Sequence, residues 1–139
     1  MERRKYIRAI YLLLTITIYS CNSVSRSSDC SKFRTGEFSH RLDLDGTIFF
    51  LERSDSVQIE TNQRTGHEVK SKITWINECE YEVLLLSQSK TGYDSALDFM
   101  RNRPMKTRII ELGSDYYIFE SKIDSFNFKY IDTLFFRRK

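Results

Sequence analysis

The chain has 139 residues, of which 40% are hydrophobic and 14% aromatic, with only 5 Gly and 1 Pro. Abundant aromatic residues and the lack of low-complexity tracts exclude a collagen-like or disordered chain, and the length fits one domain. Of the 22 Lys and Arg and the 19 Asp and Glu residues, four basic and one acidic lie within residues 1–20, which leaves 18 of each sign. A neutral body does not predict a nucleic-acid-binding surface, so we expect no nucleic-acid partner.

The first 20 residues have the pattern of an export signal. Residues 2–8 (ERRKYIR) are basic, residues 9–19 (AIYLLLTITIY) carry no charge, and Ser20 and Cys21 follow. A basic segment, a short apolar segment and a small residue before the cleavage point are typical of secretory signal peptides. An uncleaved membrane anchor is the less favoured interpretation, because the apolar run is about half of the roughly 20 residues that a membrane-spanning helix needs.

This leader resembles the signal peptides of bacterial lipoproteins. The sequence Ile18-Tyr19-Ser20-Cys21 matches their lipobox, with an aliphatic residue three positions before a Cys and a small residue just before it. The resemblance implies that residues 1–20 are removed and that Cys21 becomes an acylated N-terminus, carrying diacylglyceryl and palmitate groups that anchor the protein in a membrane. An ordinary secreted Cys is the alternative.

The polar residues 21–29 predict a flexible tether between this lipid and a domain over residues 30–139. The same resemblance implies a location in the bacterial cell envelope. Acidic residues soon after the Cys often accompany export to the cell surface, and here none precedes Asp29. We therefore expect an outer-membrane lipoprotein that faces the periplasm.

The chain has three cysteines, Cys21, Cys30 and Cys79. If Cys21 carries lipid, an even number remains in an oxidising compartment, which favours a Cys30–Cys79 disulfide. Two free buried thiols are an open alternative. A metal site is the least favoured interpretation, because no CxxC motif occurs and the two histidines lie far apart, so we expect neither a metal nor a cofactor.

The domain is predicted to be all-β. Turn residues recur about every ten positions, and the segments between them are rich in β-branched and aromatic residues, a pattern typical of a meander, sandwich or barrel. Eight strands are expected, over Glu37–Leu44, Thr47–Arg53, Val57–Asn62, Glu68–Ile76, Cys79–Leu86, Met105–Leu112, Asp115–Lys122 and Phe128–Phe136. One short helix is expected near residues 93–103, ended by Pro104.

The alternation of side chains predicts which residues face the core. We expect Phe38, His40, Leu42 and Leu44 of the first strand to share one face, with Val57 and Ile59 inward in the third strand. In the hairpin around residue 77, the inward side chains are expected to be Ile73, Trp75, Cys79, Tyr81, Val83 and Leu85. Eight sequentially paired strands close into a lipocalin-like barrel or form a strongly curved open sheet, and we favour the barrel.

The body resembles a group of small Bacteroidetes lipoproteins of unassigned function. The matching features are Cys30-x-x-Phe33-x-x-Gly36-x-Phe38, a Gln58-Ile59-Glu60 strand, and Trp75-Ile76-x-x-Cys79-x-Tyr81, so the resemblance covers roughly residues 30–86. Some members of the group carry the name of a DNA topoisomerase. The residues here do not support that activity, because no phosphate-binding Gly-rich loop is present and the body is neutral.

Few residues predict chemistry. His40 is a possible base, although a His on an apolar strand face more often forms part of the core, and His67 follows a turn. Glu78, Glu80 and Glu82 project from one face of a strand, where pairing with Lys or Arg is more usual than cation binding. We therefore predict no catalytic residue. Trp75 and Tyr81 are expected either to form a hairpin core or to line a binding mouth.

Two functions are expected above the rest. The first is binding of an apolar small molecule or an envelope partner by a β domain that the lipid on Cys21 holds at the membrane. The second is a structural or assembly role, in which the sheet surface docks onto another envelope protein. An enclosed cavity would favour the first, and a filled interior with an exposed apolar patch would favour the second. An enzymatic role is the least favoured.

Overall fold

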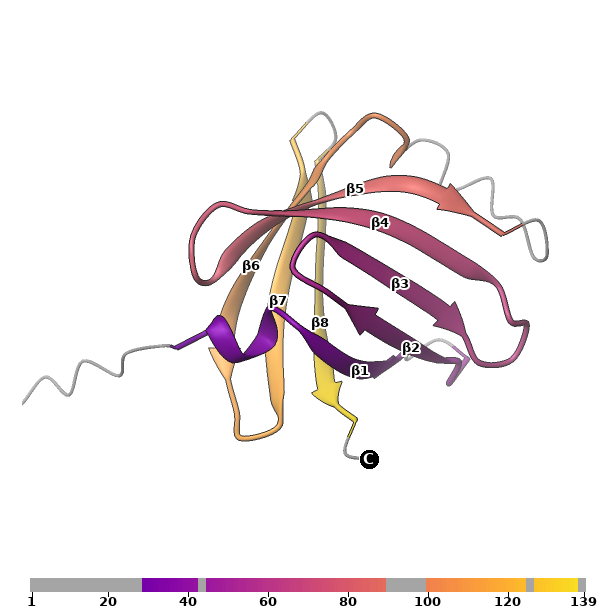
Figure 1. Ribbon diagram of the computed structural model, residues 1–139, viewed down its shortest axis with the longest axis horizontal. Helices are drawn as coiled ribbons and strands as arrows, with labels where there is room; N and C mark the ends of the chain where they lie inside the picture. Colours follow the sequence, from indigo (N-terminus) through magenta and orange to yellow (C-terminus); the bar gives the residue numbers. More distant parts are fainter. Residues whose placement is uncertain (1–28, 43–44, 90–99, 125–126, 138–139) are drawn as a thin grey trace, which may run out of the picture.

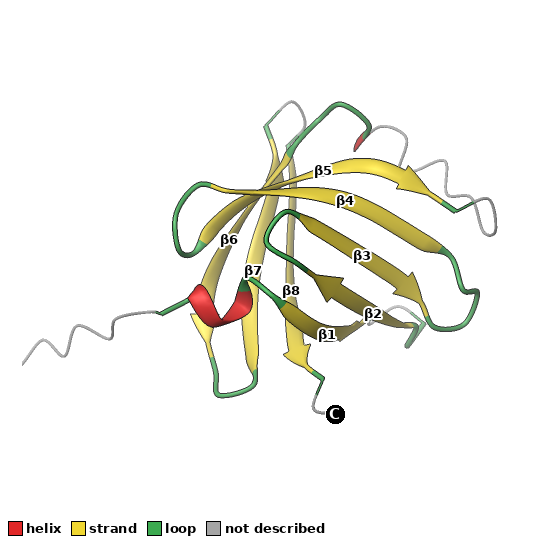
Figure 2. Ribbon diagram, in the orientation of Figure 1, coloured by secondary structure: helices red, strands yellow, loops and turns green. Residues whose placement is uncertain are grey.

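The computed structural model describes residues 29–42, 45–89, 100–124 and 127–137. Eight antiparallel strands form a closed up-and-down barrel, in which each strand pairs with the next and β8 pairs with β1 (Figures 1 and 2). A short 3-10 helix, η1 (Ser31–Phe33), precedes them. The strands are β1 (Gly36–Arg41), β2 (Ile48–Arg53), β3 (Val57–Asn62), β4 (Glu68–Trp75), β5 (Glu80–Gln88), β6 (Met105–Leu112), β7 (Tyr116–Ile123) and β8 (Phe128–Phe136).

The predicted all-β meander is confirmed, and the sheet closes rather than staying open. The strand bounds agree with the predicted ones to within a few residues. The expected helix near 93–103 lies mostly outside the described residues; of its described end, only Met100 is in a 3-10 turn, and the residues after it are not helical. There Arg101 forms a parallel bridge with Leu85, and Asn102 has a positive φ of 65°, which a right-handed helix does not accommodate. Within the described residues, no helix is long and apolar enough to cross a membrane.

The facing of β3 differs from the prediction. Gln58 pairs with the buried Arg53 and Glu60 with the buried Leu51, so these two β3 residues point into the barrel. Ile59 pairs with the exposed Glu52 on the outer surface. The prediction that Val57 and Ile59 face inward is therefore wrong. The reason is that β2 has Arg53 on its inner face, and this buried guanidinium needs a hydrogen-bond acceptor from the neighbouring strand.

An aromatic cluster fills the end of the barrel where η1 lies. The Phe33 ring lies 4.7 Å from that of Tyr117 and 5.2 Å from that of Phe136, and Phe38 lies 4.7 Å from Phe136. Phe33, Phe38 and Tyr117 have no exposed surface. Because aromatic rings bury large apolar areas in such offset contacts, η1 closes this end as a plug. Figure 1 shows η1 across the ends of the barrel strands.

The Cys30–Cys79 disulfide is confirmed, with the two Cα atoms 5.2 Å apart. It joins the residue before η1 to the turn between β4 and β5, so it fastens the plug to the barrel wall. Trp75 packs beside it, with its ring 4.6 Å from that of Tyr81 and the Arg34 guanidinium 5.0 Å above it. The predicted aromatic hairpin core therefore exists, with Tyr81 fully buried and Trp75 half-buried.

Removing the disulfide is expected to lower the free energy of unfolding by about 2–4 kcal/mol, the usual range for a loop of this size. The Cys30→Ala/Cys79→Ala variant leaves no unpaired thiol and is the one to compare with the wild type by urea denaturation. A reductant should lower the stability of the wild type to that of the variant and leave the variant unchanged. Equal stability of the two oxidised proteins would contradict the expectation.

The contacts that hold the barrel together lie within one continuous stretch of the chain. Its strand ladder closes between residues 36 and 136, and the hydrophobic cluster and the disulfide draw only on residues 30–136. We therefore expect residues 29–139 to fold on their own, and the experiments below use this domain.

Candidate functional site: the barrel cavity

A cavity of about 390 Å³ occupies the barrel between the aromatic cluster and the opposite end. It extends from Arg53, near η1, to Leu42 and His67 in the hairpin loops at the other end. Its wall is mostly apolar, formed by Phe49, Leu51, Val83, Met105, Phe119 and Leu134. This volume is within the range of small-molecule sites, which are typically apolar with a few placed polar groups.

Arg53 forms the floor of the cavity and is only 5% exposed. Its Nε and Nη2 both donate to Gln58 Oε1, at 2.9 and 2.6 Å. Its Nη1 donates to the Phe33 carbonyl at 3.2 Å, and Nη2 also donates to the Tyr81 hydroxyl at 3.2 Å. Arg53 therefore links β2 and β3 to the η1 plug and to β5.

Neutral acceptors and aromatic rings surround the positively charged guanidinium of Arg53. Among the described residues, no carboxylate pairs with it; its guanidinium instead lies 4.8 Å from the Tyr81 ring, 5.3 Å from Phe38 and 5.9 Å from Tyr117. Aromatic faces and neutral acceptors stabilise a buried cation without cancelling its charge. Burial in the same cluster raises the pKa of the Tyr117 hydroxyl well above its usual value, so this group stays neutral.

His40 lies in the cavity wall on β1 and bridges to β8. Its Nδ1 lies 2.9 Å from Asp132 Oδ2, which also accepts a hydrogen bond from the Tyr130 hydroxyl. The ring stacks on Phe49 at 5.0 Å. Its Nε2 lies 3.7 Å from Glu60 Oε1, too far for a hydrogen bond, and has no hydrogen-bond partner among the described residues.

These contacts keep His40 charged at neutral pH. Burial alone would lower the pKa of its imidazole, but the hydrogen bond that Nδ1 donates to Asp132 and the charges of Asp132 and Glu60 outweigh burial and raise the pKa to about 9. Correspondingly, the pKa of Asp132 is lowered despite partial burial, by hydrogen bonds from His40, Tyr130 and the Thr133 amide. A protonated His40 donates hydrogen bonds, so it does not fit the role of a general base at neutral pH.

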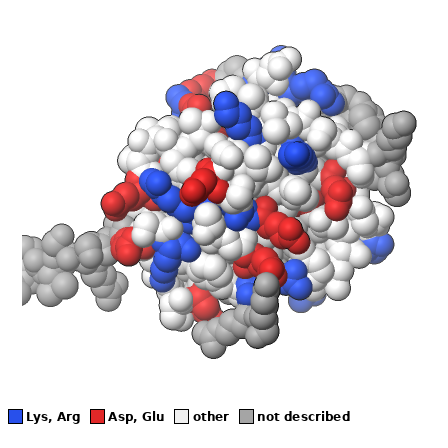
Figure 3. Space-filling model, viewed as in Figure 1, with Lys and Arg blue, Asp and Glu red and all other residues white. Residues whose placement is uncertain are grey.

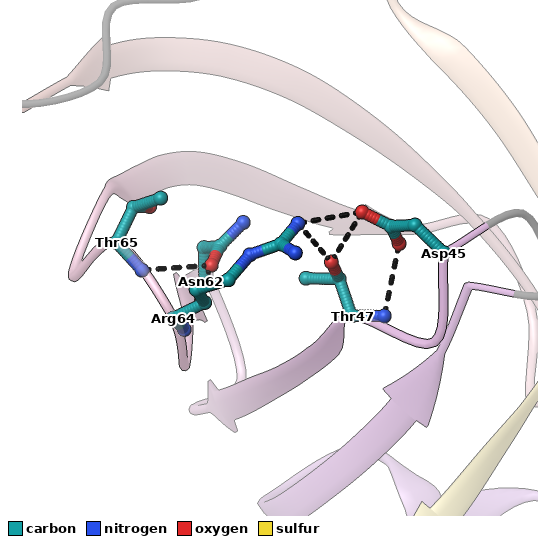
Figure 4. Close-up of polar contacts among 5 residues, drawn as sticks. All are labelled: Asp45, Thr47, Asn62, Arg64 and Thr65. Carbon is teal, nitrogen blue, oxygen red and sulfur yellow. Dashed lines mark hydrogen bonds and ion pairs between the residues drawn. The ribbon is translucent and has the colours of Figure 1, made fainter.

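Two hairpin loops are tied together at the end of the cavity far from η1. The Asp45 carboxylate accepts hydrogen bonds from the Thr47 amide at 2.9 Å and from Arg64 Nη2, in the next hairpin, at 2.6 Å (Figure 4). Asn62 Oδ1 accepts from the amides of Arg64 and Thr65. The hydrogen bonds from Thr47 and Arg64 lower the pKa of Asp45 to about 2. These contacts therefore join the two hairpins at this end of the barrel.

The structure places the residues singled out from the sequence in different roles. Tyr81 lies both in the core and at the cavity floor, whereas Trp75 packs on the core near η1 and is not among the residues that line the cavity. His40 and His67 both line the cavity. Cys21 lies outside the described residues, so its lipidation stays a prediction. Within the described part of the chain, no group of three or more His, Cys, Asp or Glu could hold a metal ion.

Sequence reasoning missed most of the polar residues that line the cavity, namely Arg53, Gln58, Glu60, Asn62 and Tyr130. It also missed Asp132, which contacts the lining residue His40. The signal that could have found them is the reverse alternation of the third strand, where Gln58 and Glu60 occupy the face opposite to Val57 and Ile59. On the outside, the face in Figure 3 shows acidic and basic side chains intermixed, without a continuous patch of one sign.

No protein-family model, curated protein or solved structure matches the chain.

Proposed function

We propose that the barrel binds an apolar small molecule in its cavity, and that a lipid on Cys21 holds this binding domain at a membrane of the bacterial cell envelope. The supporting observation is the cavity itself: about 390 Å³ in volume, walled mostly by aliphatic and aromatic side chains and closed at one end by η1. A barrel of this size whose interior served stability alone would be filled by side chains, because empty apolar space is destabilising.

Filling the cavity tests this function. Val83 lines the cavity on β5, while its neighbour Leu84 faces the outside of the same strand. In the 29–139 domain, Val83→Trp is expected to weaken binding of the neutral fluorescent probe N-phenyl-1-naphthylamine at least about tenfold, because the indole occupies the space of the probe. Leu84→Trp is the matched control and should bind the probe as the wild type does.

Circular dichroism establishes that both variants fold, since overpacking a core costs about 1–3 kcal/mol. Equal probe binding by Val83→Trp and the wild type would contradict a cavity site, as would a wild-type domain that does not bind the probe.

A second candidate is docking onto another envelope protein. Two large apolar side chains of β8, Ile131 and Phe135, are 51% and 48% exposed on the outer surface, and the Tyr116 ring lies 6.0 Å from that of Phe135. Outward-facing apolar groups on neighbouring strands favour a protein contact. The cavity favours the first function more strongly, because a docking role alone does not account for an open interior.

A further inference from the structure

The inner face of β3 carries three polar side chains in a row. Gln58, Glu60 and Asn62 all line the cavity, while the aliphatic Val57 and Ile59 of the same strand line an outer surface groove. Turning this strand over would exchange polar for apolar groups on the buried face. Buried polar groups cost free energy unless they are hydrogen-bonded, so the protein's own contacts or a ligand must compensate for this arrangement.

The protein's own contacts satisfy only part of this polar capacity. Gln58 Oε1 accepts from Arg53, and Asn62 Oδ1 accepts from two backbone amides. These hydrogen bonds use the oxygen of each side-chain amide and set its orientation, so the NH₂ group takes no part in them. Within the described part of the chain, neither NH₂ group donates a hydrogen bond, and the Glu60 carboxylate has only the long 3.7 Å contact with His40. The strand therefore presents a donor, an acceptor and a donor, at steps of about 6.6 Å.

The charges around this row exclude some ligands. Arg53 and His40 are positive, and Glu60 and Asp132 are negative, so the charges around the row balance. A ligand carboxylate placed beside Glu60 would meet a like charge, which disfavours an anionic group at the middle of the row. A purely apolar ligand would leave the donors of Gln58 and Asn62 and the acceptor of Glu60 unsatisfied.

We propose, as an extension of the ligand-binding function above, that the natural ligand is a neutral amphipathic molecule with an apolar body and two or more hydroxyl groups along one edge. Its hydroxyls bind the polar row of β3 (Gln58, Glu60 and Asn62), and its apolar body packs against the opposite wall formed by Val83, Phe119 and Leu134. A hydroxyl group both donates and accepts, so it matches an alternating row better than a carboxylate, an ester or an amine.

Three decanoyl probes that share an apolar chain test this proposal: 1-decanoylglycerol, decanoate and methyl decanoate. Each is titrated into the 29–139 domain with bound N-phenyl-1-naphthylamine, below any concentration at which it forms micelles, and its affinity is measured from displacement of this reporter. The proposal predicts that 1-decanoylglycerol binds at least about tenfold more tightly than the other two, the ratio expected for one or two added hydrogen bonds.

Substitutions in β3 test whether its polar row causes the preference for 1-decanoylglycerol. Glu60→Leu should reduce the preference for 1-decanoylglycerol over methyl decanoate to less than about threefold. Glu60→Gln keeps an acceptor but removes the charge, so it should keep that preference and strengthen decanoate binding. Ile59→Leu, on the outer face of the same strand, is the control and should keep the wild-type order.

The outcomes separate this proposal from the binding function itself. If all three probes displace the reporter equally, or if decanoate binds most tightly, the cavity binds ligands but the inferred ligand class is wrong. If the domain binds neither the reporter nor any probe, both proposals fail. A preference for 1-decanoylglycerol that Glu60→Leu leaves intact would place its hydroxyls elsewhere and overturn the role of β3.

Discussion

Raising the pH from 6 to 10 is expected to lower the free energy of unfolding by about 3 kcal/mol through His40 alone. The pKa of His40 rises from 6.5 in the unfolded chain to about 9 in the barrel. The folded state therefore holds this proton more tightly than the unfolded state. The resulting stability is fully present below pH 6.5, declines as the pH rises, and is lost above about pH 9.

Urea denaturation of the 29–139 domain at pH 6, 8 and 10 measures this effect. Because Tyr and Lys residues titrate near the upper end of this range, the quantity to compare is the difference between the wild type and a His40→Gln variant, which cannot ionise at this position. That difference should shrink by about 3 kcal/mol between pH 6 and 10. Parallel pH profiles for the two proteins would show that His40 is not charged in the folded state.

Replacing Arg53 by Met is expected to lower the free energy of unfolding by about 3 kcal/mol, as for other disrupted buried networks. The variant loses four donated hydrogen bonds and the contacts of the guanidinium with three aromatic rings. It also leaves Gln58 Oε1 and the Phe33 carbonyl buried without their donor. Removing the cost of burying a charge offsets part of this loss but not the orphaned acceptors.

A second substitution separates the two contributions. In Arg53→Met/Gln58→Leu, one orphaned acceptor is replaced by an apolar group, so about half of the lost stability should return. Arg108→Met, at an exposed position on β6, is the control and should change stability by less than about 0.5 kcal/mol. An Arg53→Met domain as stable as the wild type would contradict a role of Arg53 in holding the plug.

The strands could be predicted because their signals are local. Asp45 and Gly46 lie in the loop of the first hairpin, which a backbone hydrogen bond from Leu42 to Thr47 closes, and Gly46 has a positive φ of 69°. Alternating residues such as Phe38 and Tyr81 are buried as expected. The facing of β3 could not be predicted in the same way. Val57 and Ile59 suit a buried face by hydrophobicity, and only the neighbouring Arg53, through the β2–β3 register, reverses that preference.

The polar site depends on contacts that no local pattern encodes. His40 could be singled out from the sequence, but its partner Asp132 lies 92 residues further along the chain and reaches it only because β8 closes on β1. From its local sequence, Arg53 is expected to be an exposed residue at the end of a strand. Its burial follows from the η1 plug, whose position is set by the Cys30–Cys79 disulfide and by packing of Phe33 on Tyr117.

The junction between β1 and β8 bears on the order in which the strand ladders form during folding. It has only two aligned residue pairs, Phe38 with Phe136 and Ser39 with Phe135, whereas β7 and β8 align over eight. Its two strands lie at opposite ends of the domain sequence, so pairing them closes the longest loop in the barrel, and we expect this ladder to form last. Until then, both outer strands are free edges open to pairing with other chains. The ion pair between His40 and Asp132 spans this junction, so we expect it to stabilise the closed barrel over forms in which the two edges are apart.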